Sequence, residues 1–345
     1  MQYKNKSHRI APYIYKDRFY NYEGEKKPDV FIPSVIMLLK SHLRRRVEKE
    51  TMRDWVERTE PLRMSTQLAV TWIGHATFLI QIGTINILTD PVFGSLSVLY
   101  PRILPEGITF KQLPPIDFVL ISHNHRDHMD AHTLQLLKNQ EGITFLVPQG
   151  DKKWFRERGF GKVIENNWWD RQVYVASANG TTRIEFTFLP AFHWSQRGVF
   201  DYNKSLWGSW MILCNNTTIY FGGDTGYSSH FKCIKEEFPV IDFALMPIGP
   251  CEPRSLMRTS HINAEEAGQA FIDLGAKHFI PMHWGTYFFG TDNFMLPVDR
   301  LRAWWHTAHL DADKTLHLVK AGQRIMFDTP IVYQRKTTPF GLLEL

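Results

Sequence analysis

Short runs of apolar, β-branched and aromatic residues recur along the chain from Leu68 onward, separated by turn residues. Runs of this kind are typical of β-strands. Gly83-Thr84 predicts a hairpin turn between the second and third of them. Strands are expected at Leu68–Trp72, Thr77–Ile82, Ile85–Thr89, Phe118–Ser122, Thr144–Val147, Gln172–Ala176, Arg183–Leu189, Trp207–Leu213, Thr218–Phe221, Phe243–Pro247 and His278–Met282.

Helices are predicted between the later strands, at Leu134–Lys138, Ala264–Leu274 and Val298–Thr307. Asn263 is placed to cap the second of these helices, because its side chain can accept from a free backbone N–H of the first turn. Many strands with helices between the later ones indicate a mixed α/β architecture, with two sheets and outer helices. No repeat or linker interrupts residues 64–345, so we interpret them as one domain.

Residues 1–63 differ from the rest of the chain in composition and are interpreted as a basic N-terminal extension. They carry 15 Lys or Arg against 9 Asp or Glu, a net of +6, whereas the whole chain has a net charge of +5. Within them, Val35 to Glu60 has helical composition, with an apolar stripe beside Arg44-Arg45-Arg46. Such a helix either docks on the core or lies on anionic lipid headgroups.

Composition narrows the class of protein. Hydrophobic residues make up 43% of the chain, which is enough for a large core. The longest apolar run, Val30 to Leu39, is interrupted by Pro33 and Ser34 and is too short to span a bilayer. The polar N-terminus does not resemble a signal peptide, so a cytoplasmic protein, peripherally membrane-associated at most, is expected. The three cysteines, Cys214, Cys233 and Cys251, lack metal-site spacing, so a metal must be held by His and carboxylate.

The densest chemical signal is the stretch Ser122-His123-Asn124-His125-Arg126-Asp127-His128, directly after a predicted strand. On extended chain, two residues at i and i+2 point the same way, so His123 and His125 can share one cation. Asp127 and His128 can then reach a second cation nearby. Imidazole and carboxylate ligands with positions left open to water are typical of a catalytic zinc site.

Three isolated residues at later strand ends can complete two such sites. His193 follows one predicted strand, Asp224 lies after Gly222-Gly223, and His283 follows Met282. The glycines permit a tight backbone turn beside an ion. All three stand where a predicted strand gives way to a loop, and this common placement favours a shared pocket.

These motifs, an HxHxDH followed by a lone His, a GGD Asp and a final His, resemble those of the metallo-β-lactamase superfamily. The segments Trp72 to Thr77, His193-Trp194-Ser195, Phe221 to Tyr227, Glu252-Pro253-Arg254 and His283 to Thr286 are similar to the N-acyl-phosphatidylethanolamine-hydrolysing phospholipase D family, with a weaker echo in Arg18-Phe19-Tyr20-Asn21. The similarity runs from about residue 70 to 290. It implies the αββα sandwich of two mixed β-sheets flanked by helices.

The resemblance also implies a ligand set and a reaction. Two Zn²⁺ per subunit are expected, although Mn or Fe can occupy such sites. A hydroxide shared by the two ions would attack the phosphodiester of N-acyl-phosphatidylethanolamine, giving N-acylethanolamine and phosphatidic acid. A phospholipid partner and a homodimer follow from the same resemblance. The implied ligands are His123, His125 and His193 for one ion, Asp127, His128 and His283 for the other, and Asp224 as the bridge.

Three further residues belong to the family segments. Asp90 can accept an N–H from a ligand imidazole, and His75 is either a supporting residue of the site or a core histidine. His261 resembles a family position near the metals and can help to protonate the leaving alkoxide, as a catalytic residue beside Asp127. Its neighbour Ser260 stands where the resemblance leads us to expect glutamine.

Other functions stay open at this point. The same metals could serve a soluble phosphodiester or a sugar-phosphate lactone. A non-enzymatic membrane-binding protein with a relic metal site is the alternative of another class, but all seven ligand positions hold competent residues. A nuclease is disfavoured and no nucleic-acid partner is expected, because the portion after residue 63 carries 25 Lys or Arg against 26 Asp or Glu.

Overall fold

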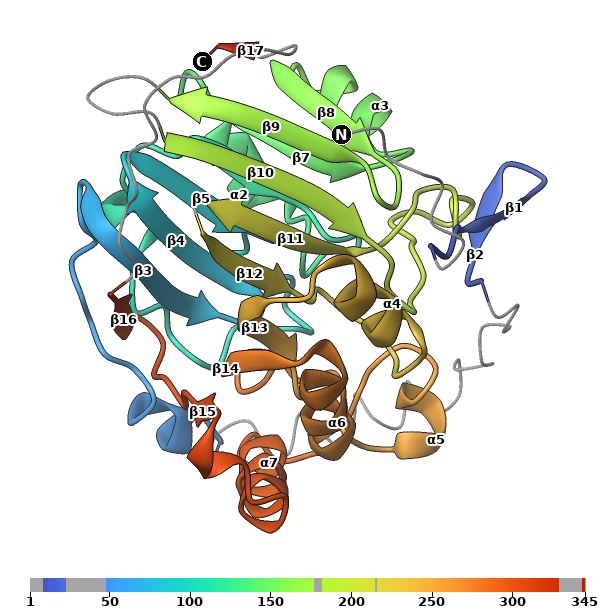
Figure 1. Ribbon diagram of the computed structural model, residues 1–345. Helices are drawn as coiled ribbons and strands as arrows, with labels where there is room; N and C mark the ends of the chain where they lie inside the picture. The colour runs from blue at the N-terminus through green and yellow to red at the C-terminus, as the bar shows by residue number, and fades with distance from the viewer. Residues whose placement is uncertain (1–8, 23–47, 177–181, 215, 329–342, 345) are drawn as a thin grey trace.

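The computed structural model describes residues 9–22, 48–176, 182–214, 216–328 and 343–344, which form two packed β-sheets with helices outside them (Figure 1). One sheet has eight strands in the order β15-β14-β13-β12-β11-β10-β9-β17 and contains parallel and antiparallel pairs. Its strands are β9 (Arg171–Ala176), β10 (Thr182–Leu189), β11 (Ser209–Cys214), β12 (Thr217–Phe221), β13 (Ile241–Pro247), β14 (Ala276–Met282), β15 (Thr315–Leu316) and β17 (Leu343–Glu344).

The second sheet has seven strands in the order β16-β3-β4-β5-β6-β7-β8 and is also mixed. A separate hairpin of β1 (Tyr13–Tyr15) and β2 (Arg18–Tyr20) projects from one side of the molecule (Figure 1). The strands of the second sheet are β3 (Ser65–Gly74), β4 (Thr77–Gly83), β5 (Ile85–Thr89), β6 (Phe118–Leu120), β7 (Thr144–Pro148), β8 (Lys162–Asn166) and β16 (Arg324–Phe327).

Strand alternation explains why the sheets pack as they do. Successive side chains of a strand point to opposite faces. In β4, Phe78 and Ile80 enter the large core between the two sheets, whereas Leu79 enters a second core on the outer face of the seven-stranded sheet. That second core includes Leu134 of α2 (Ala131–Leu137) and Phe155 of α3 (Lys152–Glu157). Because both faces of β4 are covered, its residues are apolar on both sides.

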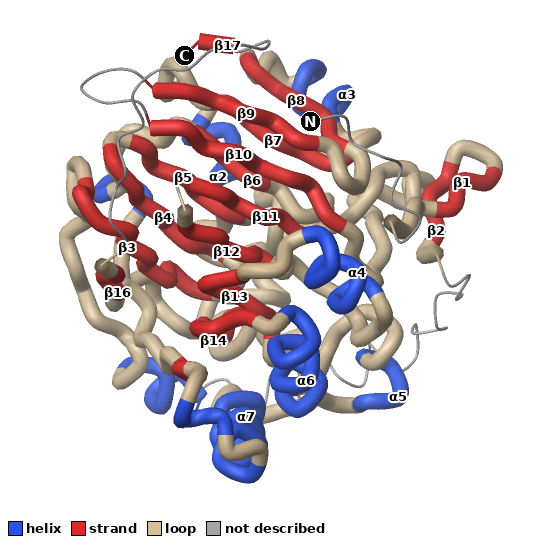
Figure 2. Tube along the Cα trace, viewed as in Figure 1, coloured by secondary structure: helices blue, strands red, loops and turns tan. Residues whose placement is uncertain are grey.

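The eight-stranded sheet is covered by a second layer of helices. Figure 2 shows α4 and α6 in blue over the red strands of this sheet. Phe231 of α4 and Phe271 of α6 belong to the large core, and α7 packs against α6. The predicted αββα sandwich is therefore confirmed. These helices are α4 (His230–Glu237), the short α5 (Arg254–Met257), α6 (Ala264–Leu274) and α7 (Leu296–Thr307).

Most predicted elements match the observed ones, and the differences have local causes. The strand at Ile85–Thr89 and the helix at Ala264–Leu274 have the predicted bounds, the helix because Asn263 and Glu266 form a capping box. The strand predicted to reach Ser122 ends at Leu120, because the backbone N–H of Ser122 bonds to the carboxylate of Asp90.

The described parts of the N-terminal segment contact the sandwich at several points. Arg9 pairs with Glu237, and Met52 is completely buried in the large core. The helix expected to extend to Glu60 ends at Arg53, and this prediction was wrong. The chain there turns to pair with a distant segment, since Glu57 N donates to Ala321 O and Ala321 N donates to Trp55 O. Residues 35–47 of that predicted helix lie outside the described residues.

Membrane-spanning character is a separate question. Among the described residues, no helix combines the length and the apolar content that crossing a bilayer requires.

Candidate metal centre

Strand ends from both sheets meet at one edge of the sandwich. Strands β10 and β12 are both antiparallel to β11, so they run in the same direction, and β13 and β14 are parallel to β12. Their carboxyl ends therefore share an edge, the one near which α4 and the β1–β2 hairpin lie (Figure 1). The ends of β5 and β6 lie at the same place, because Gly208 N donates to Ser122 O across the sheets. Each predicted ligand follows one of these strands.

The segment after β6 folds into a compact turn. His128 N and Met129 N both donate to His125 O, and Asp130 caps α2 by accepting from Thr133 N. His123 and His125 consequently present different ring atoms to the same point. His123 Nε2 lies 2.8 Å from His125 Nδ1, and Nε2 of His193 lies 3.2 Å from that same Nδ1. These three atoms form one group of nitrogen atoms that can surround a cation.

A second group lies beside the first. Nε2 of His128 is 3.4 Å from Asp127 Oδ2, and Nε2 of His283 is 3.9 Å from the same oxygen. Asp224 lies between the groups: its Oδ2 is 3.2 Å from His128 Nε2 and 3.9 Å from His193 Nε2, and its Oδ1 is 3.1 Å from His283 Nε2. The structure thus brings all seven predicted ligands together.

Gly223 provides the backbone turn that places Asp224. Its φ is +56°, a conformation that residues with a Cβ rarely adopt. A Cβ on Gly223 would also lie 2.5 Å from Cβ of Ser122 and 3.0 Å from Gly208 O. Only glycine allows the chain after β12 to approach Ser122, in the segment after β6, this closely. Asp224 follows directly.

Hydrogen bonds to the far side of each ring select which nitrogen faces the site. Nδ1 of His193 lies 2.8 Å from Ser260 O, and Nδ1 of His283 lies 2.9 Å from Gly249 O. A carbonyl can only accept, so both Nδ1 atoms donate and both Nε2 atoms keep a lone pair for a metal. Because Ser260 acts here through its main chain, its side chain is not part of this ligand support.

Asp90 is completely buried and orients one ring of each group. Its Oδ2 lies 2.7 Å from His128 Nδ1 and also accepts the hydroxyl of Ser122, whose oxygen lies 2.9 Å from His123 Nδ1. His75 lies at the site rather than in the general core, with Nε2 3.1 Å from Asp127 Oδ2. Asp90, His75 and His283 all have positive φ, so three strained residues that are not glycine meet here.

The electrostatics suit a cation. Burial lowers the pKa of His193 and of His125 to about 3, so both rings are neutral and able to ligate at neutral pH. Burial raises the pKa of Asp224, but His128 and His283 outweigh it and hold that pKa well below its usual range. His128 Nε2, His283 Nε2 and Asp224 Oδ1 are buried without hydrogen-bond partners. Buried polar atoms that face one another without hydrogen bonds are typical of metal ligands, so the residues fit a two-metal centre.

One side of the centre faces solvent. The side chains of His128, His193, Asp224 and His283 are at most 2% exposed, whereas those of Asp127 and His261 are each 17% exposed. Nδ1 of His261 lies 3.6 Å from Asp224 Oδ2. Asp127 and His261 therefore border a side from which a substrate can approach.

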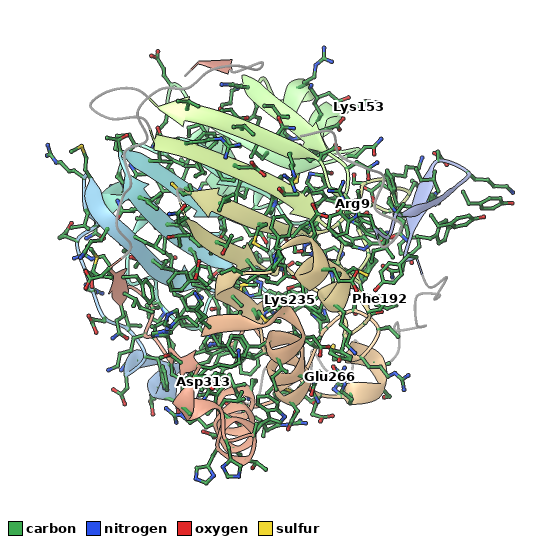
Figure 3. The ribbon with its side chains drawn as sticks, viewed as in Figure 1. Arg9, Lys153, Phe192, Lys235, Glu266 and Asp313 are labelled. Atoms are coloured by element: carbon green, nitrogen blue, oxygen red, sulfur yellow. The ribbon has the colours of Figure 1, made fainter. Side chains whose placement is uncertain are left out.

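Two residues that support the site escaped the sequence analysis. His230 is the first residue of α4 but is completely buried, with Nε2 3.2 Å from the Thr225 hydroxyl. Asn21 pairs with the main chain of His193. Its only signal was the weak Arg18-Phe19-Tyr20-Asn21 echo. Figure 3 labels Phe192, the neighbour of His193, on the side from which the β1–β2 hairpin projects.

The chain is similar to known proteins in sequence and in fold. A family model described as the beta-lactamase superfamily domain matches residues 85–284, a range that contains all seven predicted ligands. N-acyl-phosphatidylethanolamine-hydrolyzing phospholipase D 1 of Caenorhabditis elegans is 39% identical over 248 residues, 68% of this chain and 69% of that protein. The mitochondrial N-acyl-phosphatidylethanolamine-hydrolyzing phospholipase D of Saccharomyces cerevisiae is 34% identical over 239 residues, 67% of this chain and 50% of that protein. In fold, the chain resembles Igni18, a metallo hydrolase of Ignicoccus hospitalis, with a TM-score of 0.57 and 22% identity over 76% of this chain and 100% of that chain.

Proposed function

The chain belongs to the N-acyl-phosphatidylethanolamine-hydrolysing phospholipase D family of the β-lactamase superfamily and is a metal-dependent hydrolase, and on that premise we propose that it hydrolyses N-acyl-phosphatidylethanolamine to phosphatidic acid and an N-acylethanolamine. The observation that carries the proposal is the position of Asp224 between two groups of ligands. A single carboxylate within reach of both groups suits two cations close together, the arrangement that serves phosphoester hydrolysis.

The proposed cations are Zn²⁺, which favours ligand sets of imidazole and carboxylate. His123, His125 and His193 would hold one, Asp127, His128 and His283 the other, and Asp224 both. When bound, the two cations supply positive charge that neutralises the phosphodiester and acidifies the attacking water.

We infer the position of the substrate from the exposure of the residues at the site. Asp127 and His261 border the open side, so the phosphodiester is placed across them with the leaving oxygen beside His261. Burial lowers the pKa of His261 to about 3, so at neutral pH its ring is neutral. We propose that His261 forms a hydrogen bond to the leaving oxygen, and its help in protonating that oxygen stays a prediction.

Aromatic side chains border the same opening. The ring of Trp194 lies 4.1 Å from that of His125, and the ring of Tyr100 lies 5.5 Å from that of Phe289, which in turn lies 5.7 Å from His75. Apolar rings around a charged centre favour a substrate with a charged headgroup and an apolar body. This supports a lipid over a small soluble phosphodiester or a sugar-phosphate lactone.

The test is a mass-spectrometric assay in ¹⁸O-labelled water with N-acyl-phosphatidylethanolamine vesicles, a short-chain soluble phosphodiester and a sugar-phosphate lactone as parallel substrates. We expect the label in phosphatidic acid, because water attacks phosphorus, and no label in the N-acylethanolamine. Label in the alcohol product, or turnover of the lactone alone, would overturn the proposed reaction. His283→Ala serves as the variant without activity.

Peripheral association with a membrane, a cytoplasmic location and a homodimer stay predictions. The basic N-terminal segment, with a net charge of +6 over residues 1–63, supports the first of them. Replacing Arg44, Arg45 and Arg46 with Glu should weaken binding to vesicles that contain an anionic lipid, without changing turnover of a soluble substrate. Unchanged vesicle binding would count against a membrane-binding role for this segment.

A further inference from the structure

Asn21, in the N-terminal segment, is bonded to a residue of the metal centre that lies far along the chain. Its side chain is buried, with 8% of the residue exposed. Nδ2 donates to His193 O at 3.0 Å, and Oδ1 accepts from His193 N at 3.3 Å. One amide therefore satisfies both main-chain groups of a proposed ligand, as a neighbouring strand would.

The orientation of that amide is fixed by a third bond. Nε1 of Trp207 donates to Asn21 Oδ1 at 3.1 Å, and the same N–H reaches Ala191 O at 3.1 Å. Trp207 is completely buried. Since two donors point at Oδ1 and a carbonyl oxygen lies at Nδ2, a flipped amide would lose its bonds.

The next residue, Tyr22, contacts the neighbourhood of the bridging ligand. Its ring packs edge-on against Phe192, the residue before His193, and its hydroxyl accepts from His230 N at 3.1 Å. His230 in turn lies 3.2 Å from the hydroxyl of Thr225, which follows Asp224. Thr225 Oγ1 accepts from Phe192 N at 2.9 Å. The segment thus reaches the chain around His193 and beside Asp224.

The other two ligands of the first group need no such help. His123 and His125 lie on the turn after β6, which is held by bonds within itself and by Asp90 through Ser122. His193 lies four residues beyond the end of β10, in a loop without strand partners of its own at that residue. Its position therefore depends more on side-chain bonds, to Ser260 on the ring and to Asn21 on the main chain.

The geometry points to Asn21 as a positioning residue that holds the main chain of His193, so that the first metal site is complete only when the N-terminal segment is in place. The inference rests on the proposed function in that His193 acts there as a ligand. It goes beyond that function because Asn21 lies outside the matched range of residues 85–284. A simple anchoring role would stabilise the segment without changing metal affinity.

The experiment titrates metal-free full-length protein with Co²⁺ against a competing chelator, and follows the visible absorption of the bound ion. Asn21→Ala leaves two buried main-chain groups of His193 unpaired. We expect the affinity for one ion to fall by about 10-fold or more and the affinity for the other to stay unchanged. Loss of a ligand's supporting bond typically costs about 10–100-fold in metal affinity. Arg9→Ala is the matched control: it removes the bond to Glu237 from the same segment, and both ions should bind as in wild type.

Each outcome decides the inference. Wild-type affinity for both ions in Asn21→Ala, or equal weakening in Arg9→Ala, would overturn it. If Asn21→Ala does not unfold cooperatively, Asn21→Asp is used. That carboxylate keeps the size and the acceptor but cannot donate to His193 O, so the same loss of one ion is expected. Failure of the proposed function is distinguishable, because the Co²⁺ titration needs no turnover: two ions bound with no phosphodiester cleaved would overturn only the reaction.

Discussion

The carboxylate of Asp90 lies 2.7 Å from Nδ1 of His128, and both side chains are completely buried. The same carboxylate accepts the backbone N–H and the hydroxyl of Ser122, and that hydroxyl contacts His123. One residue outside the ligand set therefore orients a ring in each of the two groups. The direct bond to His128 and the indirect contact with His123 make Asp90 the structural link between them.

Asp90→Ala should weaken both metals together, unlike the change at Asn21, because both groups lose an oriented ring. We expect a drop of about 10–100-fold in metal affinity and a parallel loss of turnover at subsaturating metal. Metal titration of the chelator-treated protein measures it. The metal affinity of Asp90→Asn, which keeps the size and an acceptor oxygen, should lie between those of wild type and Asp90→Ala. A full loss in Asp90→Asn with no loss in Asp90→Ala would contradict the assignment.

His283→Ala and Asp127→Asn should each remove turnover while leaving the fold intact. Both residues belong to the second group, and the substitutions take away a ligand atom facing His128. We expect kcat/KM to fall by at least about 100-fold, with the bound metal reduced toward one ion per chain. Circular dichroism and elemental analysis accompany the assay. Full activity in either variant would refute the two-metal assignment.

Gly223→Ala should destabilise the protein and displace Asp224. The new Cβ would meet Ser122 at 2.5 Å in a backbone with φ of +56°. Strain and overpacking together should cost about 2–4 kcal/mol in the free energy of unfolding. Gly142→Ala is the control, since its φ is +85° but nothing lies within 4 Å of the added Cβ, so about 1 kcal/mol is expected. Equal losses in urea unfolding would rule out the close approach as the cause.

Acid should destabilise the metal-free protein partly through His230. Burial lowers its pKa to about 3, against about 6.5 in the unfolded chain. Between these values the unfolded chain binds a proton that the folded one does not, so this stability is present above pH 6.5 and is lost as the pH falls. From pH 7 to pH 5 the loss is about 2 kcal/mol.

The measurement is urea unfolding of wild type and His230→Gln at both pH values, with chelator present. The stability advantage of wild type should shrink by that amount at pH 5. The exposed His306 provides the control, because His306→Gln should leave the difference from wild type constant. Parallel pH profiles for wild type and His230→Gln would contradict the role of burial.

Removal of metal should lower thermal stability and abolish turnover, both reversibly. His128, His283 and Asp224 each keep a buried atom without a hydrogen-bond partner, and an ion bound only by the folded state stabilises it in proportion to the logarithm of its concentration. Calorimetry with and without chelator, followed by addition of Zn²⁺, measures the change. A melting temperature that is indifferent to Zn²⁺ would count against the centre.

Local signals explain which elements the sequence could predict. The helix at Ala264–Leu274 has its own capping box, and the hairpin at Gly83 has its own turn, so neither depends on distant residues. β8 was missed because its sequence Lys-Val-Ile-Glu-Asn is polar at both ends and does not read as apolar. The end of the N-terminal helix was placed wrongly because Ala321, almost 270 residues away, pairs with the chain beyond Arg53.

The residues of the site also fall into those that the sequence could predict and those that it could not. The seven ligand candidates were visible because their residue types at strand ends are unusual, and parallel strands bring such ends together. Asn21 and His230 were not, because an asparagine after a strand or a histidine at the start of a helix is common. Their importance comes from contacts with His193 and Thr225 that only the folded chain creates.

The metal loop and His75 follow strands of the seven-stranded sheet, whereas His193, Asp224 and His283 follow strands of the eight-stranded one. Ions bound by residues from both sheets would link the two layers of the sandwich. Opening one layer while the other stays closed would then require release of the ions, so backbone amides on both sides of the central core should exchange with solvent in a single cooperative step.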